Sequence, residues 1–433
     1  MLKNDKEIGN NVLKILIVHH TMPDIPGFTT KMFDGVLPIL KKYVNTKATW
    51  VIHSEPNLVT KSEPDEKIIN MSNFKNAVEI INQEKPDLVY AIPGISIPDY
   101  AFALAAKYLK IPVIGSEMDS NFLFIKNMRG MISTSNKLQQ SDIAKKSNQF
   151  FKKHLFLIKT QLALRWNIFQ IMKDIIFFTT VYFPIIYKNP DYMPKFELDR
   201  IFVLSNKTMQ KLVTSGFNES NLVITGDPTY DEYFQLLKTS KKRNTPKNKK
   251  NILILTTILF GESRRNILSQ RRFFIEEIIK AIPRNQFEVT IKIHPTHEDL
   301  KDYTNIVEPI NSSVNVTQNA NLVELILNAD IIITPVTGTS AICSLIARKP
   351  IIIWNVFNVE SDALIQNKLA LPCKDQKMIL EQIRKAEKWI PKEEDIEQFL
   401  RENFHSSDGK ASERMANEIL NFLKSSGSHI FNK

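Results

Sequence analysis

One segment near the C-terminal end constrains the fold of this chain more than any other. Residues 330–355 read DIIITPVTGTSAICSLIARKPIIIWN: an apolar run, a hydroxyl-rich turn, a short apolar helix and a second apolar run. Continuous apolar runs are typical of strands buried in a parallel sheet, and two neighbouring parallel strands need a helical crossover between them. The segment therefore predicts a β-α-β unit, and with it an α/β fold on a parallel sheet.

The turn inside this unit carries the first candidate ligand site. It falls where a strand ends and a helix begins, so unpaired backbone N–H groups and the positive end of the helix dipole favour an anion there. Its hydroxyl groups add donors, and a glycine allows a ligand to come close. An ordinary capped turn would show the same pattern and is the alternative. The candidate phosphate ligands are Thr337, Gly338, Thr339 and Ser340.

The same alternation of apolar runs and amphipathic segments extends along the chain. Such alternation predicts parallel, doubly wound sheets with right-handed crossovers, whose ligands bind outside the carboxyl ends of the strands. The predicted strands of the first half are Lys14–His20, Thr49–Ser54, Asp87–Pro93, Pro112–Glu117, Arg200–Ser205 and Leu222–Gly226. Those of the second half are Asn251–Thr257, Glu288–His294, Val314–Thr317, Asp330–Thr334 and Ile351–Trp354.

The length of 433 residues favours two domains over one core. The polar, strongly basic segment KTSKKRNTPKNKK at 238–250 is the expected linker. We therefore expect two Rossmann-like doubly wound parallel-sheet domains facing across a cleft. They are residues 1–237, on the acceptor side, and 251–433, which would bind the donor and end in helices.

An insertion at about 147–187 departs from this pattern. It is rich in large apolar side chains, including the run IIFFTTVYFPIIY, and is interrupted by lysine and arginine. This combination suits an amphipathic helix lying on an anionic membrane surface. It equally suits packing on the first domain or at a homodimer interface, because apolar periodicity does not distinguish lipid from protein.

Composition narrows the class of protein. The net charge of +11 permits phosphorylated ligands, anionic membranes or nucleic acid, but the basic linker lacks the interleaved aromatic residues that bind single strands, so we expect no nucleic acid. Two cysteines give no disulfide framework and favour a reducing, cytoplasmic location. The N-terminus lacks the apolar core of a signal peptide, and no uncharged apolar stretch is long enough to span a bilayer.

Four segments in this order resemble the GT-B group of nucleotide-sugar enzymes. The group includes UDP-N-acetylglucosamine 2-epimerase and the CDP-glycerol glycerophosphotransferase and capsule-type transferases, and the resemblance covers most of the chain outside the insertion. The segments are 86–120, 199–231 with the turn TGDPTYD, the strand end KIHP at 292–295, and 330–350.

Departures from the epimerase pattern favour a transferase. The epimerase resemblance requires an aspartate where Ile95 stands, a histidine where Gly115 stands, and paired glutamates near Ala341. Epimerisation abstracts and returns a proton, so missing acid and base groups are hard to replace. We expect a glycosyl- or glycerophosphoryl-type transferase of surface polysaccharide or glycolipid synthesis. A 2-epimerase-like isomerase and a non-catalytic glycan- or partner-binding protein are the alternatives.

The resemblance and the strand ends together assign the donor side. A nucleotide-sugar or a CDP- or CMP-linked donor would be the substrate, with no cofactor and no metal required. His294 ends a strand and as imidazolium would neutralise leaving-group charge. Besides His294 and the turn 337–340, the donor-site candidates are Arg264, Gly226 and Asp227.

The acceptor side needs a base for the attacking hydroxyl of a glycan or lipid-linked acceptor. A carboxylate screened from water has a raised pKa and can serve. Glu117 is the first choice because it also matches the family motif. Insertion 147–187 would bring the chain to the inner face of the membrane, where lipid-linked acceptors lie. The candidates for the base are Glu117, Asp119, His20 and Asp24.

Overall fold

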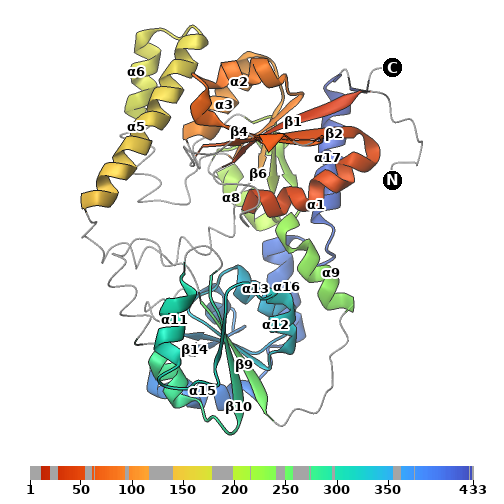
Figure 1. Cartoon of the computed structure of the whole chain (residues 1–433). Coiled ribbons are helices and arrows are strands. Elements are labelled where there is room, and N and C mark those ends of the chain that lie inside the picture. The colour runs from red at the N-terminus through yellow and green to blue at the C-terminus, as the bar shows by residue number, and fades with distance from the viewer. Residues whose placement is uncertain are drawn as a thin grey trace. The chain divides into compact units, whose positions relative to one another are not determined.

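The computed structural model forms two compact units (Figure 1). The described residues are 11–19, 28–53, 61–62, 64–92, 97–116, 140–177, 198–214, 216–239, 249–256, 273, 275–294, 298–354, 362–374, 376–428 and 430–431. The first unit lies within residues 1–118, 144–231 and 401–433, and the second within 119–143 and 232–400. Each unit is an α/β domain, as the alternating sequence predicted.

The first unit is built on an eight-stranded sheet of order β3-β4-β2-β1-β5-β6-β7-β8. Its strands pair in parallel except at the edge, where β3 runs antiparallel to β4. The central strands are buried, which explains their continuous apolar sequences. The strands are β1 Val12–His19, β2 Asn45–Ile52, β3 Lys61–Ser62, β4 Glu66–Asn70, β5 Leu88–Tyr90, β6 Val113–Ser116, β7 Arg200–Val203 and β8 Leu222–Ile224.

Helices cover both faces of this sheet. One buried cluster joins the sheet to α2, α3, α5 and α8, and another joins the opposite face to α1 and α17 (Figure 1). The bounds are α1 Phe28–Tyr43, α2 Ala77–Glu84, α3 Ile97–Tyr108, α5 Gln140–Ala163, α6 Ile168–Ile176, α8 Asn206–Thr214 and α17 Ala411–Ser425. Two helices lie where the chain passes between units: α9 Asp231–Thr239 and α16 Glu393–Phe404.

The end of the chain belongs to the first unit, which corrects the expected domain 251–433. Helix α17 packs against α1, and a Cβ built on Gly35 of α1 would lie 2.2 Å from Ser412 Oγ. Glycine at this position lets the two helices approach this closely without any movement of the Ser412 side chain. The division after Asp231 also falls before the expected boundary at residue 237.

Helices α5 and α6 are the described part of the predicted insertion. Their inner side is fixed to the first unit: the Ala77 N–H donates to Thr160 Oγ1 at 3.1 Å, and the Tyr100 hydroxyl donates to Asp174 Oδ1 at 3.0 Å. Burial raises the pKa of the Asp174 carboxyl, against the effect of its hydrogen bonds. Packing on the first domain, one of the open alternatives, therefore accounts for one side of these helices.

The second unit is a fully parallel six-stranded sheet of order β11-β10-β9-β12-β13-β14. Helices α11 and α15 share a buried cluster with one face, while α12 and α13 contact the sheet at β9 and β12 (Figure 1). The strands are β9 Lys250–Leu255, β10 Phe287–Lys292, β11 Asn315–Thr317, β12 Ile331–Thr334, β13 Ile351–Trp354 and β14 Leu371–Cys373. The helices are α11 Leu300–Val307, α12 Leu322–Asn328, α13 Thr339–Ile346, α14 Ala363–Gln366 and α15 Ile379–Ala386.

Candidate functional site in the second unit

The strand order of the second sheet reverses between β9 and β12. The chain runs outward from β9 to β10 and β11, then returns to place β12 on the other side of β9. Open parallel sheets bind ligands at the carboxyl ends of the strands that flank such a reversal. Thr256 follows β9, His294 follows β10, and the turn 335–338 follows β12. The predicted donor residues of this unit that the structure describes therefore lie at the expected edge of the sheet.

A buried aspartate holds the turn after β12. Asp362 is fully buried and accepts the Thr337 N–H at 2.8 Å and the Thr337 hydroxyl at 2.5 Å. It also caps α14 by accepting the N–H groups of Leu364 and Ile365. The Thr337 side chain was predicted to bind phosphate, but its buried hydroxyl is engaged by Asp362. Thr337 thus fixes the turn, while the next residues face outward.

The N-terminus of α13 presents backbone donors and room for a ligand. Gly338 is its N-cap, and among the described residues no side chain caps this end. A Cβ built on Gly338 would meet no atom of the described residues within 4 Å, and its φ of −139° is open to any residue. Protein packing therefore does not require a glycine here. Thr339 is exposed and Ser340 half-buried, so both side chains can reach an anion at the helix N-terminus.

A buried glutamate organises the strand end at His294. The His294 N–H donates to Glu298 Oε2 at 2.5 Å, and the Tyr303 hydroxyl donates to Glu298 Oε1 at 2.6 Å. Thr256, at the end of β9, donates its hydroxyl to Glu298 Oε2. Gln318 Nε2 donates to the His294 carbonyl at 3.2 Å. His294 itself is half-buried, with its backbone held on both sides.

Two lysines in the segments that resemble the family, Lys292 and Lys349, donate hydrogen bonds to backbone carbonyls. Lys292 Nζ donates to the Gln318 carbonyl at 2.6 Å. Lys349 Nζ donates to the carbonyls of Leu327 and Ala329 at 2.8 and 2.6 Å, at the C-terminal end of α12. Cations near the last carbonyls of a helix stabilise it. Neither lysine is needed to explain an anion site.

The turn TGDPTYD after β8 packs against the C-terminal helix of its own unit. Gly226 has a φ of +81°, and its Cβ would lie 3.1 Å from the Phe404 carbonyl oxygen. Asp227 accepts the Thr229 N–H at 2.9 Å, and Asp231 accepts the N–H groups of Ala411 and Ser412 at 2.9 and 2.7 Å. Burial raises the pKa of the Asp231 carboxyl, although these N–H groups oppose the shift. Donor binding by Gly226 and Asp227 stays a prediction.

The remaining predicted site residues lie outside the described part of the chain. In the first sheet, β1 ends at His19 and β6 ends at Ser116. The residues concerned are His20, Asp24, Glu117, Asp119 and Arg264. Their roles stay predictions.

The described strand ends of the first sheet carry buried polar groups. Asp99, in the first turn of α3, accepts the Ile92 N–H at 2.8 Å just beyond β5. Burial raises the pKa of the Tyr90 hydroxyl strongly, so this phenol stays neutral and cannot act as a base near neutral pH. Through its bond to Ile92, Asp99 acts as a hydrogen-bond acceptor for the backbone at this edge of the sheet, a role that the sequence had not suggested.

Two side chains that organise the candidate site, Asp362 and Glu298, were missed by sequence reasoning. Asp362 had a usable signal, because an aspartate before a short apolar helix is a common N-cap. Glu298 had none, since its partner Thr256 lies 42 residues away in the chain. Asp231 was considered only as part of the turn 225–231, and its bonds to residues some 180 positions away had no local signal. Within the described residues no group of three or more histidine, cysteine, aspartate or glutamate side chains could hold a metal ion.

Solved structures share the fold of the whole chain. The UDP-GlcNAc 2-epimerase from Methanocaldococcus jannaschii is 15% identical, with a TM-score of 0.52 over 95% of this chain and 100% of that chain. The calicheamicin glycosyltransferase CalG4 is 14% identical, with a TM-score of 0.51 over 96% and 99%. A putative UDP-N-acetylglucosamine 2-epimerase from Listeria monocytogenes is 13% identical, with a TM-score of 0.51 over 95% and 97%. These likenesses confirm the predicted GT-B fold and, at such identities, nothing about activity.

Sequence comparison is more specific. No curated protein matches the chain. A family model described as CDP-Glycerol:Poly(glycerophosphate) glycerophosphotransferase matches residues 194–421, a span that includes His294, the turn 337–340 and the turn 225–231. The predicted resemblance to this group is thereby confirmed. Because the match covers more than half of its residues, the chain belongs to the CDP-glycerol:poly(glycerophosphate) glycerophosphotransferase family.

Proposed function

We propose that the chain transfers a glycerophosphoryl group from CDP-glycerol to a hydroxyl of a polymer or lipid-linked acceptor. The observation that carries the proposal is the N-terminus of α13. It lies at the strand-order reversal of the second sheet, and among the described residues no side chain caps it and no atom fills the space beside Gly338. Such an end suits the phosphates of a nucleotide diphosphate donor.

The chemistry requires few protein groups. An acceptor oxygen attacks the β-phosphorus, a new P–O bond forms, and the bond from that phosphorus to the oxygen of CMP breaks. CMP leaves carrying the negative charge, and the hydroxyl proton passes to a base. Backbone N–H groups of α13, the hydroxyls of Thr339 and Ser340, and His294 would stabilise the charge on the phosphates. For the base, Glu117 remains the first choice, with Asp119, His20 and Asp24 as the others.

The test is acceptor-dependent release of CMP from radiolabelled CDP-glycerol by the full chain. Ser340→Ala is expected to lower kcat/KM about tenfold, and His294→Ala about a hundredfold, because each removes a donor to the phosphates. The matched control is Ser344→Ala on the same helix, whose buried hydroxyl donates to the Ser340 carbonyl at 2.8 Å. It is expected to keep full activity. Activity is also expected to survive EDTA.

Other outcomes select the alternatives. Conversion of UDP-N-acetylglucosamine without an acceptor would mean an isomerase. Binding of CDP-glycerol without release of CMP, whichever acceptor is supplied, would mean a non-catalytic protein. Equal activity of Ser340→Ala and Ser344→Ala would remove α13 from the donor site.

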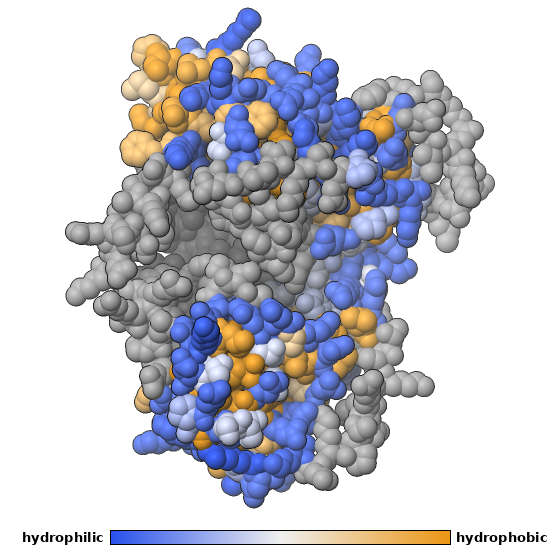
Figure 2. Space-filling model, viewed as in Figure 1, coloured by the Kyte–Doolittle hydropathy of each residue, from blue (hydrophilic) through white to orange (hydrophobic). Residues whose placement is uncertain are grey.

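We further propose that this reaction takes place on an anionic membrane surface, through the outer side of α5 and α6. Apolar side chains on that side are exposed, from 50% at Leu155 to 79% at Phe169. Figure 2 shows hydrophobic residues gathered where Figure 1 places these helices, at the upper left. The exposed apolar residues are Phe151, Leu155, Leu162, Ile168, Phe169, Met172 and Ile176.

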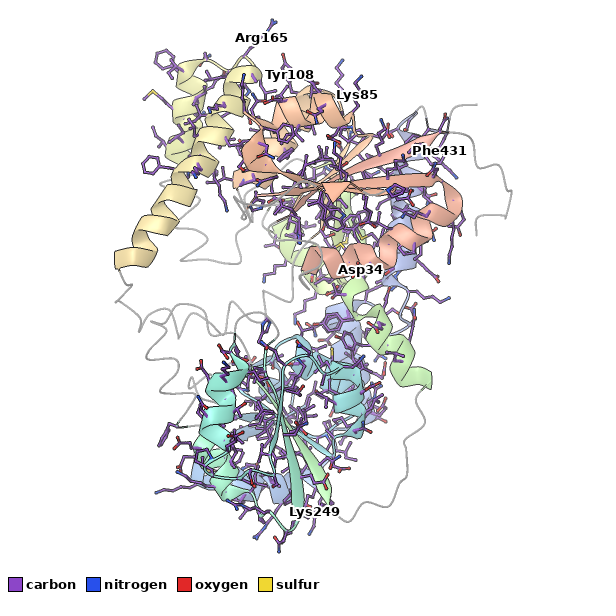
Figure 3. All side chains as sticks on the ribbon, in the orientation of Figure 1. Asp34, Lys85, Tyr108, Arg165, Lys249 and Phe431 are labelled. Carbon is purple, nitrogen blue, oxygen red and sulfur yellow. The ribbon has the colours of Figure 1, made fainter. Side chains whose placement is uncertain are left out.

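The charges on the same helices favour lipid over protein as the occupant. Within described residues 151–177, every exposed charged side chain is basic. Arg165 marks the turn between the helices, and its side chain points outward (Figure 3). Large apolar groups flanked by exposed cations match an interfacial helix on anionic headgroups. No described helix is long and apolar enough to cross a bilayer. The exposed basic residues are Lys152, Lys159, Arg165 and Lys173.

Vesicle co-sedimentation tests this surface. The full chain is expected to bind vesicles of phosphatidylglycerol and phosphatidylcholine, and not vesicles of phosphatidylcholine alone. Phe169→Ser combined with Met172→Ser should weaken binding about tenfold, because two apolar side chains no longer enter the interface. Ile390→Ser, at an equally exposed site of the second unit (65%), is the matched control. A dimer in solution that the double variant dissociates, with no vesicle binding, would assign the surface to a second copy instead.

A further inference from the structure

Glu298 is a buried carboxylate that is hydrogen-bonded to two strand ends and to one side chain of α11. It lies one residue before Asp299, the N-cap of α11, which accepts the Lys301 N–H. The Glu298 carboxylate instead accepts hydrogen bonds from Thr256 and His294, at the ends of two neighbouring strands, and from Tyr303. Glu298 therefore joins the strand ends at the candidate donor site and leaves the capping of α11 to its neighbour.

The same network fixes the backbone of His294 on both sides. The N–H is bonded to Glu298, and the carbonyl accepts from Gln318 Nε2, which also donates to the Glu298 carbonyl at 2.8 Å. Because the N–H and the carbonyl of His294 are both hydrogen-bonded, the position of its Cα and the direction of its Cα–Cβ bond are fixed. Groups that stabilise developing charge are effective only when they are positioned before the reaction.

We propose that Glu298 is a positioning residue of the donor site, acting through His294. The inference rests on the proposed function, in which His294 contacts the donor phosphates. A carboxylate suits the position because it only accepts hydrogen bonds, and three donors point at it. In Glu298→Gln the remaining oxygen can still serve His294 and Thr256, while the amide faces the Tyr303 hydroxyl, which can turn to accept.

A double-mutant cycle tests whether Glu298 acts through His294. The measurements are the affinity for CDP-glycerol by calorimetry and the release of CMP, for Glu298→Ala, His294→Ala and the two together. Glu298→Ala alone is expected to lower affinity about tenfold, and Glu298→Gln to restore most of it. In the His294→Ala background, Glu298→Ala should change affinity by less than about twofold. An equal loss in both backgrounds would overturn the inference, as would a fully active Glu298→Ala variant.

Asp299→Ala is the matched control, since it removes the neighbouring carboxylate and the cap of α11. It is expected to lower the melting temperature and to leave donor affinity unchanged. A loss of affinity equal to that of Glu298→Ala would show that any damage to this helix start has the same effect.

A second readout does not depend on the donor. Modification of His294 by diethylpyrocarbonate, followed by mass spectrometry, reports how its ring is presented. Glu298→Ala should change that rate at least about threefold, while Asp299→Ala should not. An unchanged rate would overturn the positioning role. If the wild-type chain bound no CDP-glycerol, the proposed function would fail, and the modification rates would still decide whether Glu298 positions His294.

Discussion

Two turns of similar composition follow strands in the two units, but they differ in what surrounds them. TGDPTYD follows β8 in the first unit, and the turn leading into TGTS follows β12 in the second. Both contain a glycine among threonines, and both suggested a donor phosphate site. In the first, the space beside Gly226 is filled by Phe404, Ala411 and Arg414 of the same unit. In the second, no atom of the described chain lies within 4 Å of a Cβ built on Gly338.

The difference lies in where the backbone N–H groups find their acceptors. In the first unit Asp231 caps α17 and so ties the end of the chain to the sheet. In the second unit Asp362 accepts two hydrogen bonds from Thr337, which fixes the turn. No described side chain caps the start of α13. A turn whose backbone N–H groups all donate to protein acceptors contributes to stability. A turn whose N–H groups are not all used by protein acceptors can bind an anion.

The largest effect is expected from filling the closed turn. Gly226→Ala should lower the free energy of unfolding by about 3 kcal/mol, because a Cβ is strained at a positive φ and also collides with the Phe404 carbonyl. Gly427→Ala is the control: its φ is +69°, but its Cβ would meet no described atom within 4 Å. It should cost only the conformational strain, about 1 kcal/mol. Urea unfolding measures both, and equal losses would refute the packing argument.

Removing the cap of α17 comes next. Asp231→Ala should destabilise the chain by about 2 kcal/mol, because the buried N–H groups of Ala411 and Ser412 lose their acceptor. Hydrogen exchange should rise first in α17, since its docking on α1 depends on this cap. A loss spread evenly over the first unit, with α17 still protected, would contradict this prediction.

Filling the open turn should affect binding and spare stability. Gly338→Ala is expected to change the free energy of unfolding by less than about 0.5 kcal/mol, since its φ suits alanine and no described residue lies near the added methyl. The methyl would lie where the donor phosphates approach, so CDP-glycerol affinity should fall about tenfold, or 1.4 kcal/mol. Unchanged affinity would place the donor elsewhere.

This contrast also marks how far sequence reasoning reaches. Apolar runs predicted strands that the structure has within a few residues, such as β1 and β13, because burial on both faces leaves a clear signal. The edge strands β3 and β14, and β4 next to β3, were not predicted, since their short sequences are polar, mixed or contain proline.

Side-chain roles were harder to predict than strands. The fit of Gly35 against Ser412 and the bonds of Asp231 to α17 join residues far apart in the chain, and no local pattern encodes them. Thr337 shows the same limit within one motif. Its hydroxyl was a plausible phosphate ligand until Asp362, in another loop, was found bonded to it.

The smallest predicted effect is a pH dependence that belongs to the closed turn. Burial raises the pKa of the Asp231 carboxyl above its ordinary value of 3.8, even though Ser412 and Ala411 donate hydrogen bonds to it. The folded chain then holds this proton more tightly than the unfolded chain. Its contribution to stability is therefore fully present below pH 3.8 and is lost as the pH rises through the folded pKa.

Asp231→Asn separates this contribution from all other titrations. Asparagine keeps one acceptor for the α17 N–H groups but does not ionise. The stability of the wild type minus that of Asp231→Asn should decrease as the pH rises from 3.8 through the folded pKa, and level off above it. Urea unfolding at each pH measures the difference. A difference that grew with pH would mean that the hydrogen bonds and Arg414 outweigh burial, so that the closed turn favours a charged cap.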